Sequence, residues 1–331
     1  MVRKSTGMAA AQMHDAPALE LVTIGRIGVD LYPEQIGVSL AEVKTFAKFL
    51  GGGPTNVAVA AARLGRRAAV VTKVGDDGFG EYARAALERF GVDTRWVLTH
   101  PTLRTPITFC EIHPPDHFPL LFYREPIAPD LTIRTEELPI DEIVRVPLVW
   151  TSGTALCTEP SRSTVLELLE ARGRRGIVVH DLDYRPQFWQ DAAESGALGR
   201  EALRYAHVAV GNLDEVEVVA GTRDPRRAAG ELLALGVELA VVKMGPAGVY
   251  AQSAAETVEI GPAPVEVLNG LGAGDGFGGA LCHCLLSGLD LARSLAFANA
   301  AGAIVASRLA CADAMPTLAE ISELMETSHD G

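Results

Sequence analysis

From Leu19 onward the chain repeats one pattern: a short β-branched or apolar run, a turn rich in Gly, Asn or Asp, and then a stretch rich in Ala, Leu, Glu and Arg. The apolar runs are nearly continuous, as in strands of a parallel sheet covered on both faces. They occupy residues 21–25, 69–73, 148–151, 177–182, 208–211 and 239–244. Helices are predicted at residues 55–64, 80–90, 161–174, 226–235, 274–286 and 291–307. The pattern predicts an α/β fold with a central, mostly parallel sheet flanked by helices, and ligands at the carboxyl ends of its strands.

Two stretches, residues 31–50 and 105–130, depart from this alternation. They read as extended, hairpin-like segments with prolines at their corners. Together they could form a small β lid, which would exclude water from a reactive site. We therefore predict a flexible N-terminal tail at residues 1–18 and one domain at residues 19–331 that carries both lid segments.

Composition excludes several classes of partner. The formal net charge is −13, and no run of Lys and Arg is long enough to follow a nucleic-acid backbone. No stretch offers about 18 uninterrupted apolar residues, so no membrane span is predicted. The five cysteines are an odd number, form no CxxC pair and lie mostly in apolar segments, which favours a reducing, cytoplasmic location.

The sharpest local feature is a glycine-rich turn at residues 269–277, directly before a helical pattern. There the backbone N–H groups of Gly272, Ala273 and Gly274 could meet an anion at the start of the helix. Asp275, in the first helical turn, could accept a proton from a hydroxyl group. The alternative is an ordinary loop in which Asp275 only favours the helix start. The turn lacks the Gly-Lys-Ser/Thr of a Walker A loop, and it lies too late in the chain for a dinucleotide fingerprint.

This turn resembles the C-terminal signature of the PfkB, or ribokinase-like, carbohydrate kinase family, Asp-Thr-x-Gly-Ala-Gly-Asp. The resemblance runs from about residue 19 to residue 318, and it implies a ribokinase-like fold and an ATP-dependent sugar kinase. It also implies roles for the matching residues. The amides of Gly272, Ala273 and Gly274 would form an anion hole for the transferred phosphoryl group, and Asp275 would be the catalytic base.

Further motifs of the family concern sugar binding. Gly52, Gly53 and Asn56 belong to a Gly-Gly-Gly-Pro-Thr-Asn segment that holds sugar hydroxyls in the family, and Asp30 follows the first strand where relatives have a substrate-binding Asp. Glycine backbone can approach a ligand closely, and the amide and carboxylate groups suit a diol. Taken alone, the same residues could form a tight turn and a solvated strand end.

A second group of resemblances concerns the binding of ions and phosphates. Asn212 and Glu215 look like the family's Asn-x-x-Glu motif, which organises Mg²⁺ and its waters around ATP, although Asn is also a common helix N-cap. At the start of the C-terminal signature, Asn269 and Gly270 replace Asp-Thr. Because that Asp helps bind a monovalent cation in some relatives, activation by K⁺ is in doubt for a chain with a neutral Asn269.

Two more resemblances concern the binding of the nucleotide. Lys243, Gly245 and Gly248 resemble the family's Lys-x-Gly-x-x-Gly turn, whose backbone lies along ATP. Asn299 falls where relatives contact adenine. A polar position on a packed helix is the alternative for Asn299.

Arg124 and Arg185 indicate an acidic sugar, because arginine can bind a carboxylate through two hydrogen bonds. Both resemble carboxylate-binding arginines of 2-keto-3-deoxygluconate kinases in the family, and the alternative for each is a surface salt bridge. Subfamily motifs at residues 46–49, 152–156, 183–189 and 314–317 resemble those of family members that phosphorylate the 6-hydroxyl of 5-dehydro-2-deoxy-D-gluconate in inositol catabolism. The resemblance therefore implies that reaction.

Other functions stay open at this stage. A 2-keto-3-deoxygluconate kinase or a fructokinase could use the same scaffold, and a silent sugar-binding regulator could keep the fold without activity. A nicotinamide dehydrogenase lacks its complete glycine fingerprint after the first strand. The partners implied are ATP and a small sugar acid, and lid strands could pair in a homodimer.

Overall fold

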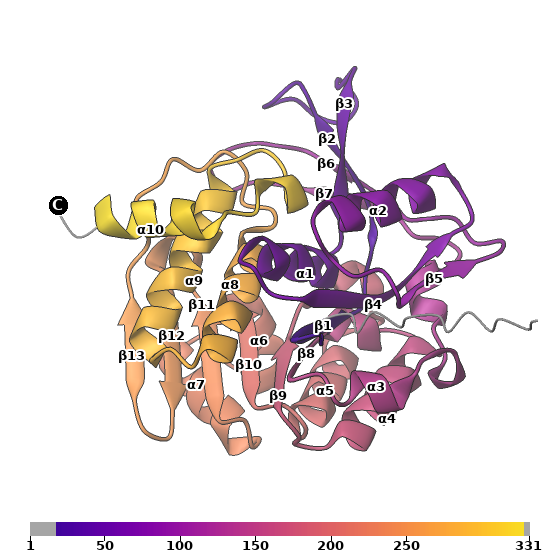
Figure 1. Cartoon of the computed structure of the whole chain (residues 1–331). Helices are drawn as coiled ribbons and strands as arrows, with labels where there is room; N and C mark the ends of the chain where they lie inside the picture. Colours follow the sequence, from indigo (N-terminus) through magenta and orange to yellow (C-terminus); the bar gives the residue numbers. More distant parts are fainter. Residues whose placement is uncertain (1–17, 328–331) are drawn as a thin grey trace, which may run out of the picture.

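The computed structural model describes residues 18–327, so the predicted N-terminal tail lies outside the described residues except for residue 18. A large and a small β-sheet organise the chain (Figure 1). The large sheet has nine strands in the order β13-β12-β11-β10-β9-β8-β1-β4-β5, and the small one has four in the order β3-β2-β6-β7. The predicted α/β class, with a large central sheet and a small second sheet, is confirmed.

Parallel pairing dominates the large sheet. Its parallel strands are β1 (Leu21–Ile24), β4 (Ala68–Gly75), β5 (Val97–His100), β8 (Leu148–Ser152), β9 (Ile177–Asp181), β10 (Val208–Asn212) and β11 (Leu239–Lys243). Strands β12 (Val249–Ser253) and β13 (Thr257–Ile260) complete one edge in antiparallel pairing. The central strands are buried on both faces, which explains why their sequences are almost wholly apolar.

Helices cover both faces of this sheet (Figure 1). The core on one face includes side chains from α1 (Gly53–Arg63), α2 (Gly78–Arg89), α8 (Ala273–Ser287), α9 (Leu291–Ala306) and α10 (Leu318–Thr327). The opposite face is covered by α3 (Ile140–Ile143), α4 (Ser161–Arg172), α5 (Ala192–Leu203), α6 (Leu213–Ala220) and α7 (Pro225–Ala234). All the predicted strands and helices are present.

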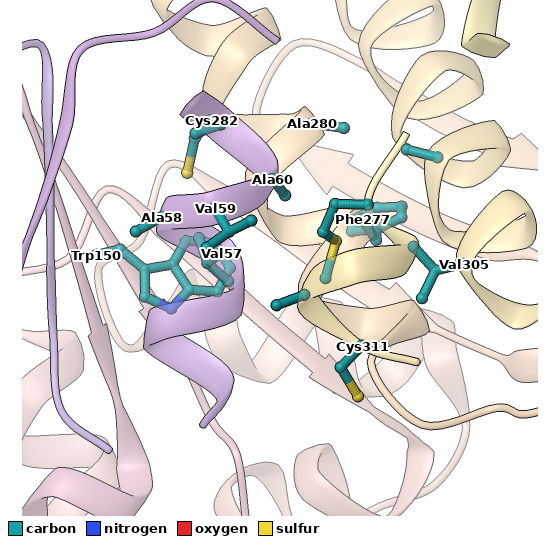
Figure 2. Packing of buried hydrophobic residues seen from close by; sticks show 14 of the residues in the cluster. Val57, Ala58, Val59, Ala60, Trp150, Phe277, Ala280, Cys282, Val305 and Cys311 are labelled. Atoms are coloured by element: carbon teal, nitrogen blue, oxygen red, sulfur yellow. The ribbon is translucent and has the colours of Figure 1, made fainter. Parts of the chain in front are cut away.

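Helices α1 and α8 pack closely because α8 presents glycines to α1. A Cβ built on Gly279 would lie 2.3 Å from Ala60 Cβ, and one on Gly278 would lie 2.6 Å from Trp150 Cη2. Figure 2 shows Trp150 lying against α1 beside Val57. Because Gly279 carries no side chain, α1 and α8 approach closely here, and their N-terminal ends are held in a fixed relation to each other.

The small sheet is the predicted lid. It consists of β2 (Gly28–Pro33), β3 (Phe46–Gly51), β6 (Ile107–Cys110) and β7 (Leu120–Tyr123). Asp30, Thr108 and Phe122 are paired across β2, β6 and β7, so their side chains share one face. The lid begins at Gly28, earlier than the predicted residue 31, because β2 follows β1 after a short turn. Asp30 is therefore a lid residue, and the prediction that it simply follows the first strand was incomplete.

Surface features of residues 18–327 bear on two further predictions. No helix in this part of the chain is long and apolar enough to cross a membrane. Leu121 and Tyr123 are exposed on the edge strand β7 of the lid. An exposed apolar edge is compatible with pairing between two copies, and the homodimer stays a prediction.

Candidate active site

The site lies where the strand order of the large sheet changes direction. Strand β1 pairs with β8 on one side and with β4 on the other, and this is the place where open α/β sheets bind ligands. Arg26 follows β1, Thr154 follows β8, and Asp183 follows β9, so all three lie near the carboxyl edge of adjacent strands. The lid strand β2 continues from the same turn as Arg26.

A cavity opens between this edge and the lid. Its lining includes all the residues predicted to bind the sugar, together with part of the glycine-rich turn: Asp30, Gly52, Gly53, Asn56, Arg124, Arg185, Gly272 and Asp275. Residues far apart in the sequence are thus brought to one place. Arg26, Tyr32, Phe122 and Cys311 also line the cavity, and sequence reasoning did not select them.

Asp275 occupies the first turn of α8, as predicted. Asn56 Nδ2, on α1, donates a hydrogen bond to Asp275 Oδ2 at 2.8 Å. Burial by the surrounding protein raises the pKa of Asp275 to about 6, against the effect of this hydrogen bond, which lowers it. The carboxylate therefore faces the cavity as a base whose pKa lies close to neutrality.

The turn before Asp275 has the geometry of an anion site. Gly272 caps α8 with φ +82°, and a Cβ there would lie 2.7 Å from Cys311 Sγ, so this position requires glycine. The first N–H groups of a helix lack intrahelical acceptors, and in α8 they belong to residues that include Ala273 and Gly274. These donors and the positive end of the helix dipole favour an anion beside Asp275.

Gly52 and Gly53 bring backbone close to the same point. Gly52 has φ +108°, and a Cβ on it would lie 2.3 Å from the carbonyl oxygen of Arg26. A Cβ on Gly53 would lie 3.3 Å from Asp275 Oδ1 and 3.4 Å from Arg26 Nη2. The Gly-Gly segment therefore leaves room between the carboxylate and the guanidinium.

A buried ion cluster lies next to the cavity, which two of its members, Arg26 and Arg185, line. Asp183 Oδ2 accepts hydrogen bonds from Arg26 Nη2 at 2.9 Å and Thr154 Oγ1 at 2.7 Å, and Asp183 Oδ1 accepts one from Arg185 Nε at 3.0 Å. Burial alone would raise the pKa of Asp183, but Arg26 and Arg185 hold it well below its usual range. Asp183 also has a positive φ of 29°, which is uncommon for a residue other than glycine.

Sequence reasoning missed Arg26 and Asp183 as site residues. Each is a charged residue just beyond a buried strand, at the edge where ligands bind, and this placement is the signal that could have found them. Their contact spans 157 positions in the sequence, so the pairing itself was not visible there.

Arg124 lies at the lid side of the cavity and is already paired. Its Nη2 donates to the buried Asp130 Oδ2 at 2.6 Å. The guanidinium carbons of Arg124 and Arg26 lie 5.4 and 5.7 Å from the centre of the Phe188 ring, and Phe122 packs edge-on against that ring at 4.8 Å. Phe188, in the 3₁₀ turn Pro186–Phe188, thus supports two of the arginines that line the cavity.

Asp30 contributes a second carboxylate to the cavity. Burial raises its pKa to about 7, an effect that Arg26 opposes and Asp275 reinforces. A carboxyl group with this pKa can either accept or donate a hydrogen bond near neutral pH.

Of the residues predicted to organise Mg²⁺, Asn212 ends β10 and Glu215 lies in the first turn of α6. Asn212 Oδ1 accepts from the N–H groups of Asp214 and Glu215 at 2.9 Å, and Glu215 Oε2 accepts from Asn212 N at 2.6 Å. This is the helix cap that the sequence left as the alternative. The cap fixes the Glu215 carboxylate beside Lys243, whose Nζ lies 4.0 Å from Glu215 Oε2 and 3.8 Å from Asp181 Oδ1.

Lys243 connects this group to the anion site. A Cβ built on Gly274 would lie 3.2 Å from Lys243 Nζ, so the ammonium stands at the start of α8. Burial raises the pKa of Asp181, an effect that Lys243 opposes, and Asp181 Oδ1 accepts no hydrogen bond from residues 18–327. Lys243, predicted from its place in a nucleotide motif, therefore presents its charge to a phosphate position.

The other predicted nucleotide residues lie outside the cavity. Gly248 has φ +91°, and a Cβ there would lie 2.0 Å from Ile260 O, so the turn after β11 needs glycine. Gly245, in the same turn, has φ +57° and open space around it. Asn299 Nδ2, on α9, donates to Gly261 O at 2.9 Å, just beyond β13.

Two observations concern ions. Across residues 18–327 no cluster of three or more His, Cys, Asp or Glu side chains could hold a metal. Asp181 Oδ1, which accepts no hydrogen bond from these residues, and the neighbouring Glu215 fit a Mg²⁺ ion held mainly by phosphates and waters. Asn269, at the position in doubt for K⁺, donates from Nδ2 to Leu309 O at 2.5 Å and accepts from Leu271 N at 3.0 Å.

Comparison with known proteins identifies the family of the chain. The model of the pfkB family carbohydrate kinases matches residues 18–318. The chain therefore belongs to the pfkB family of carbohydrate kinases.

Curated relatives carry more specific names than the family model does. The 5-dehydro-2-deoxygluconokinase of Shouchella clausii is 33% identical over 96% of this chain and 99% of its own length, and that of Bacillus subtilis is 31% identical over 95% and 98%. Among solved structures, a candidate ribokinase II from E. coli in complex with ATP and Mg²⁺ superposes with a TM-score of 0.84 at 25% identity, over 93% of this chain and 99% of that one. A PfkB protein from Polaromonas sp. JS666 superposes with a TM-score of 0.80 at 25% identity, over 92% of this chain and 99% of that one.

Proposed function

We propose that this chain transfers the γ-phosphoryl group of ATP to the 6-hydroxyl of 5-dehydro-2-deoxy-D-gluconate, a step of inositol catabolism. The observation that carries the proposal is the placement of Asp275 beside the start of α8, inside a cavity that three arginines line. The relatives named 5-dehydro-2-deoxygluconokinase support the choice of substrate.

On the acceptor side, the cavity provides groups for each part of a keto sugar acid. Arg124 and Arg185 line it and retain N–H groups beyond those used for Asp130 and Asp183, which suits the carboxylate. Asp30 and the backbone at Gly52 and Gly53 suit hydroxyl groups. The 6-hydroxyl would then lie against Asp275, which removes its proton as the bond to phosphorus forms.

On the nucleotide side, the chain provides charge stabilisation. The N–H groups at the start of α8 and the Lys243 ammonium, which lie close together, would face the moving phosphoryl group. Glu215 and Asp181 would hold Mg²⁺ through its waters, and the bound ion would neutralise charge on the phosphates. Asn212, Gly245, Gly248 and Asn299 would lie along the rest of ATP. K⁺ is not part of the proposal, because both polar ends of the Asn269 side chain are engaged within the chain.

A substrate panel tests the proposal. We expect 5-dehydro-2-deoxy-D-gluconate to give the highest kcat/KM in an assay that couples ADP release to a spectroscopic signal. 2-Keto-3-deoxygluconate and fructose are the matched comparisons, because they keep a primary hydroxyl but change the position of the ketone or remove the acid. If fructose is phosphorylated more efficiently than either acid, the role of the arginines is wrong.

The pH profile tests the role of Asp275. Because a base must be ionised and burial raises its pKa to about 6, kcat/KM should fall about tenfold per pH unit below that pH and level off above it. The measurement uses saturating ATP and Mg²⁺ and varies the sugar acid. Asn56→Ala removes the hydrogen bond that lowers this pKa, so the acidic limb should move to higher pH. If the acidic limb of the profile stays at the same pH in this variant, it reports the ionisation of a group other than Asp275.

A further inference from the structure

Arg26 is the charged residue of the cavity for which neither the sequence nor the family resemblance supplies a role. We propose that Arg26 recognises the C5 carbonyl oxygen of the substrate and so makes the enzyme select a 5-keto acid over the corresponding 5-hydroxy acid. The inference rests on the proposed function and deepens it, because it assigns a residue to the group that distinguishes this substrate.

The position of Arg26 relative to the base is the first argument. Asp275 Oδ1 and Arg26 Nη2 both border the space next to Gly53, at 3.3 and 3.4 Å from a Cβ built on that glycine. A hydroxyl that gives its proton to Asp275 is carried by C6. The oxygen on the next carbon, C5, would then be close to Arg26, which borders the same space.

The hydrogen-bonding capacity of Arg26 is the second argument. Its Nε donates to Thr154 Oγ1 at 2.9 Å and its Nη2 to Asp183 Oδ2 at 2.9 Å. The Nη1 amino group donates to no residue of the described chain, and Arg26 lines the cavity although it is 7% exposed. A guanidinium only donates hydrogen bonds, so this group is available to an acceptor on the ligand.

The neighbours of Arg26 explain why a ketone is preferred to a hydroxyl. A ketone oxygen only accepts, whereas a hydroxyl also carries a proton that needs an acceptor. Both oxygens of Asp183 already accept from Arg26, Arg185 and Thr154. Asp275 is occupied by the attacking hydroxyl and Asn56. A 5-hydroxyl at this place would have to share Asp183 with its three donors, Asp275 with the attacking hydroxyl and Asn56, or Asp30 with the other hydroxyl groups of the sugar. A ketone oxygen needs no acceptor and avoids this competition.

Arg26 is also held rigidly enough to discriminate. Its carbonyl oxygen accepts from Thr55 Oγ1 at 2.9 Å, and its guanidinium lies 5.7 Å from the centre of the Phe188 ring. The side chain is therefore fixed at its base, along its plane and at two of its nitrogens. A donor fixed in this way cannot turn aside to accommodate an additional proton.

The test compares two acids that differ only at C5, 5-dehydro-2-deoxy-D-gluconate and 2-deoxy-D-gluconate. We expect the wild-type chain to favour the keto acid in kcat/KM by at least about tenfold, and Arg26→Gln to lose at least about tenfold of that preference, the size of one hydrogen bond to a charged group. Glutamine offers both a donor and an acceptor and so suits either oxygen. Arg26→Lys offers donors alone and should keep most of the preference.

The ratio of the two kcat/KM values is independent of how much of a preparation is folded, because both acids are assayed on the same sample. Arg124→Gln is the matched control: it removes a guanidinium from the same cavity and should lower kcat/KM for both acids without changing their ratio. An unchanged ratio in Arg26→Gln would overturn the role of Arg26. Equal use of both acids by the wild-type chain would overturn it as well, while sugar-acid kinase activity would stand. Failure to phosphorylate either acid would contradict the proposed function itself.

Discussion

Replacing Asp275 with asparagine is expected to lower the turnover number by about two to four orders of magnitude, the range lost when a general base is removed. The substitution keeps the size of the side chain and leaves the start of α8 intact, but the amide cannot take a proton from the acceptor hydroxyl. Affinity for ATP should stay within about threefold of wild type, because the N–H groups of the turn and Lys243 are unchanged. Steady-state kinetics and calorimetric titration with ATP measure the two quantities.

A matched control exists one helix further along the chain. Asp290 caps α9 by accepting from Arg293 N at 2.9 Å, so Asp290→Asn makes the same chemical change at another helix start. Asparagine caps a helix about as well as aspartate, so this variant should keep full activity. If Asp275→Asn turns over at a rate within tenfold of wild type, Asp275 is not the base and the phosphoryl acceptor must be activated by another group.

The second large effect is expected for Asp183→Asn. Asparagine tolerates the positive φ of this position, so the substitution removes charge without adding backbone strain. Arg26 and Arg185 would then lose their shared carboxylate, and breaking a buried ion pair from one side costs about 3 kcal/mol of unfolding free energy. The KM for the sugar acid should also rise, because both arginines line the cavity.

Chemical denaturation and substrate kinetics check this prediction together. Asp191→Asn is the control, because Asp191 follows Asp183 closely but is exposed and only caps α5, where it accepts from Glu194 N. It should change the unfolding free energy by less than about 0.5 kcal/mol. An Asp183→Asn protein as stable as wild type would mean that the two arginines find other partners or water.

Much of the fold could be predicted because its strands are buried on both faces. Segments such as 208–211 and 239–244 are almost wholly apolar, and amphipathic helices separate them, so local periodicity was sufficient. Elements whose sequence lacks this contrast between apolar strands and amphipathic helices were not predicted. Helix α6 contains several valines, which favour strands, and it begins at the Asn212 cap that was assigned to phosphate organisation. Helix α5 contains Gly196, where a Cβ would lie 2.4 Å from Val218 O, so its glycine serves close packing against α6.

The candidate site likewise has residues that could be predicted from the sequence and interactions that could not. Residues in a motif, such as Asp275 and Gly53, could be located from spacing and family resemblance, and the cavity brings them together. Interactions that depend on tertiary structure could not. Asn56 and Asp275 are 219 positions apart, and the hydrogen bond between them exists because the glycines of α8 let α1 approach. Arg26 was missed because its significance depends on Asp183 and Thr154, which reach it from two other strands.

The acceptor cavity has walls of two different origins. Asp30, Phe122 and Arg124 come from the lid or its margin, whereas Asp275 and Asn56 come from two tightly packed helices of the main body. The groups that the lid contributes to sugar selection can thus diverge without disturbing the position of the acid that activates the sugar, whereas Arg26 and Arg185 belong to the main body. Laboratory evolution toward new acceptors should accordingly accumulate its productive changes in β2, β6 and β7, and reject them along the seam where α8 meets α1.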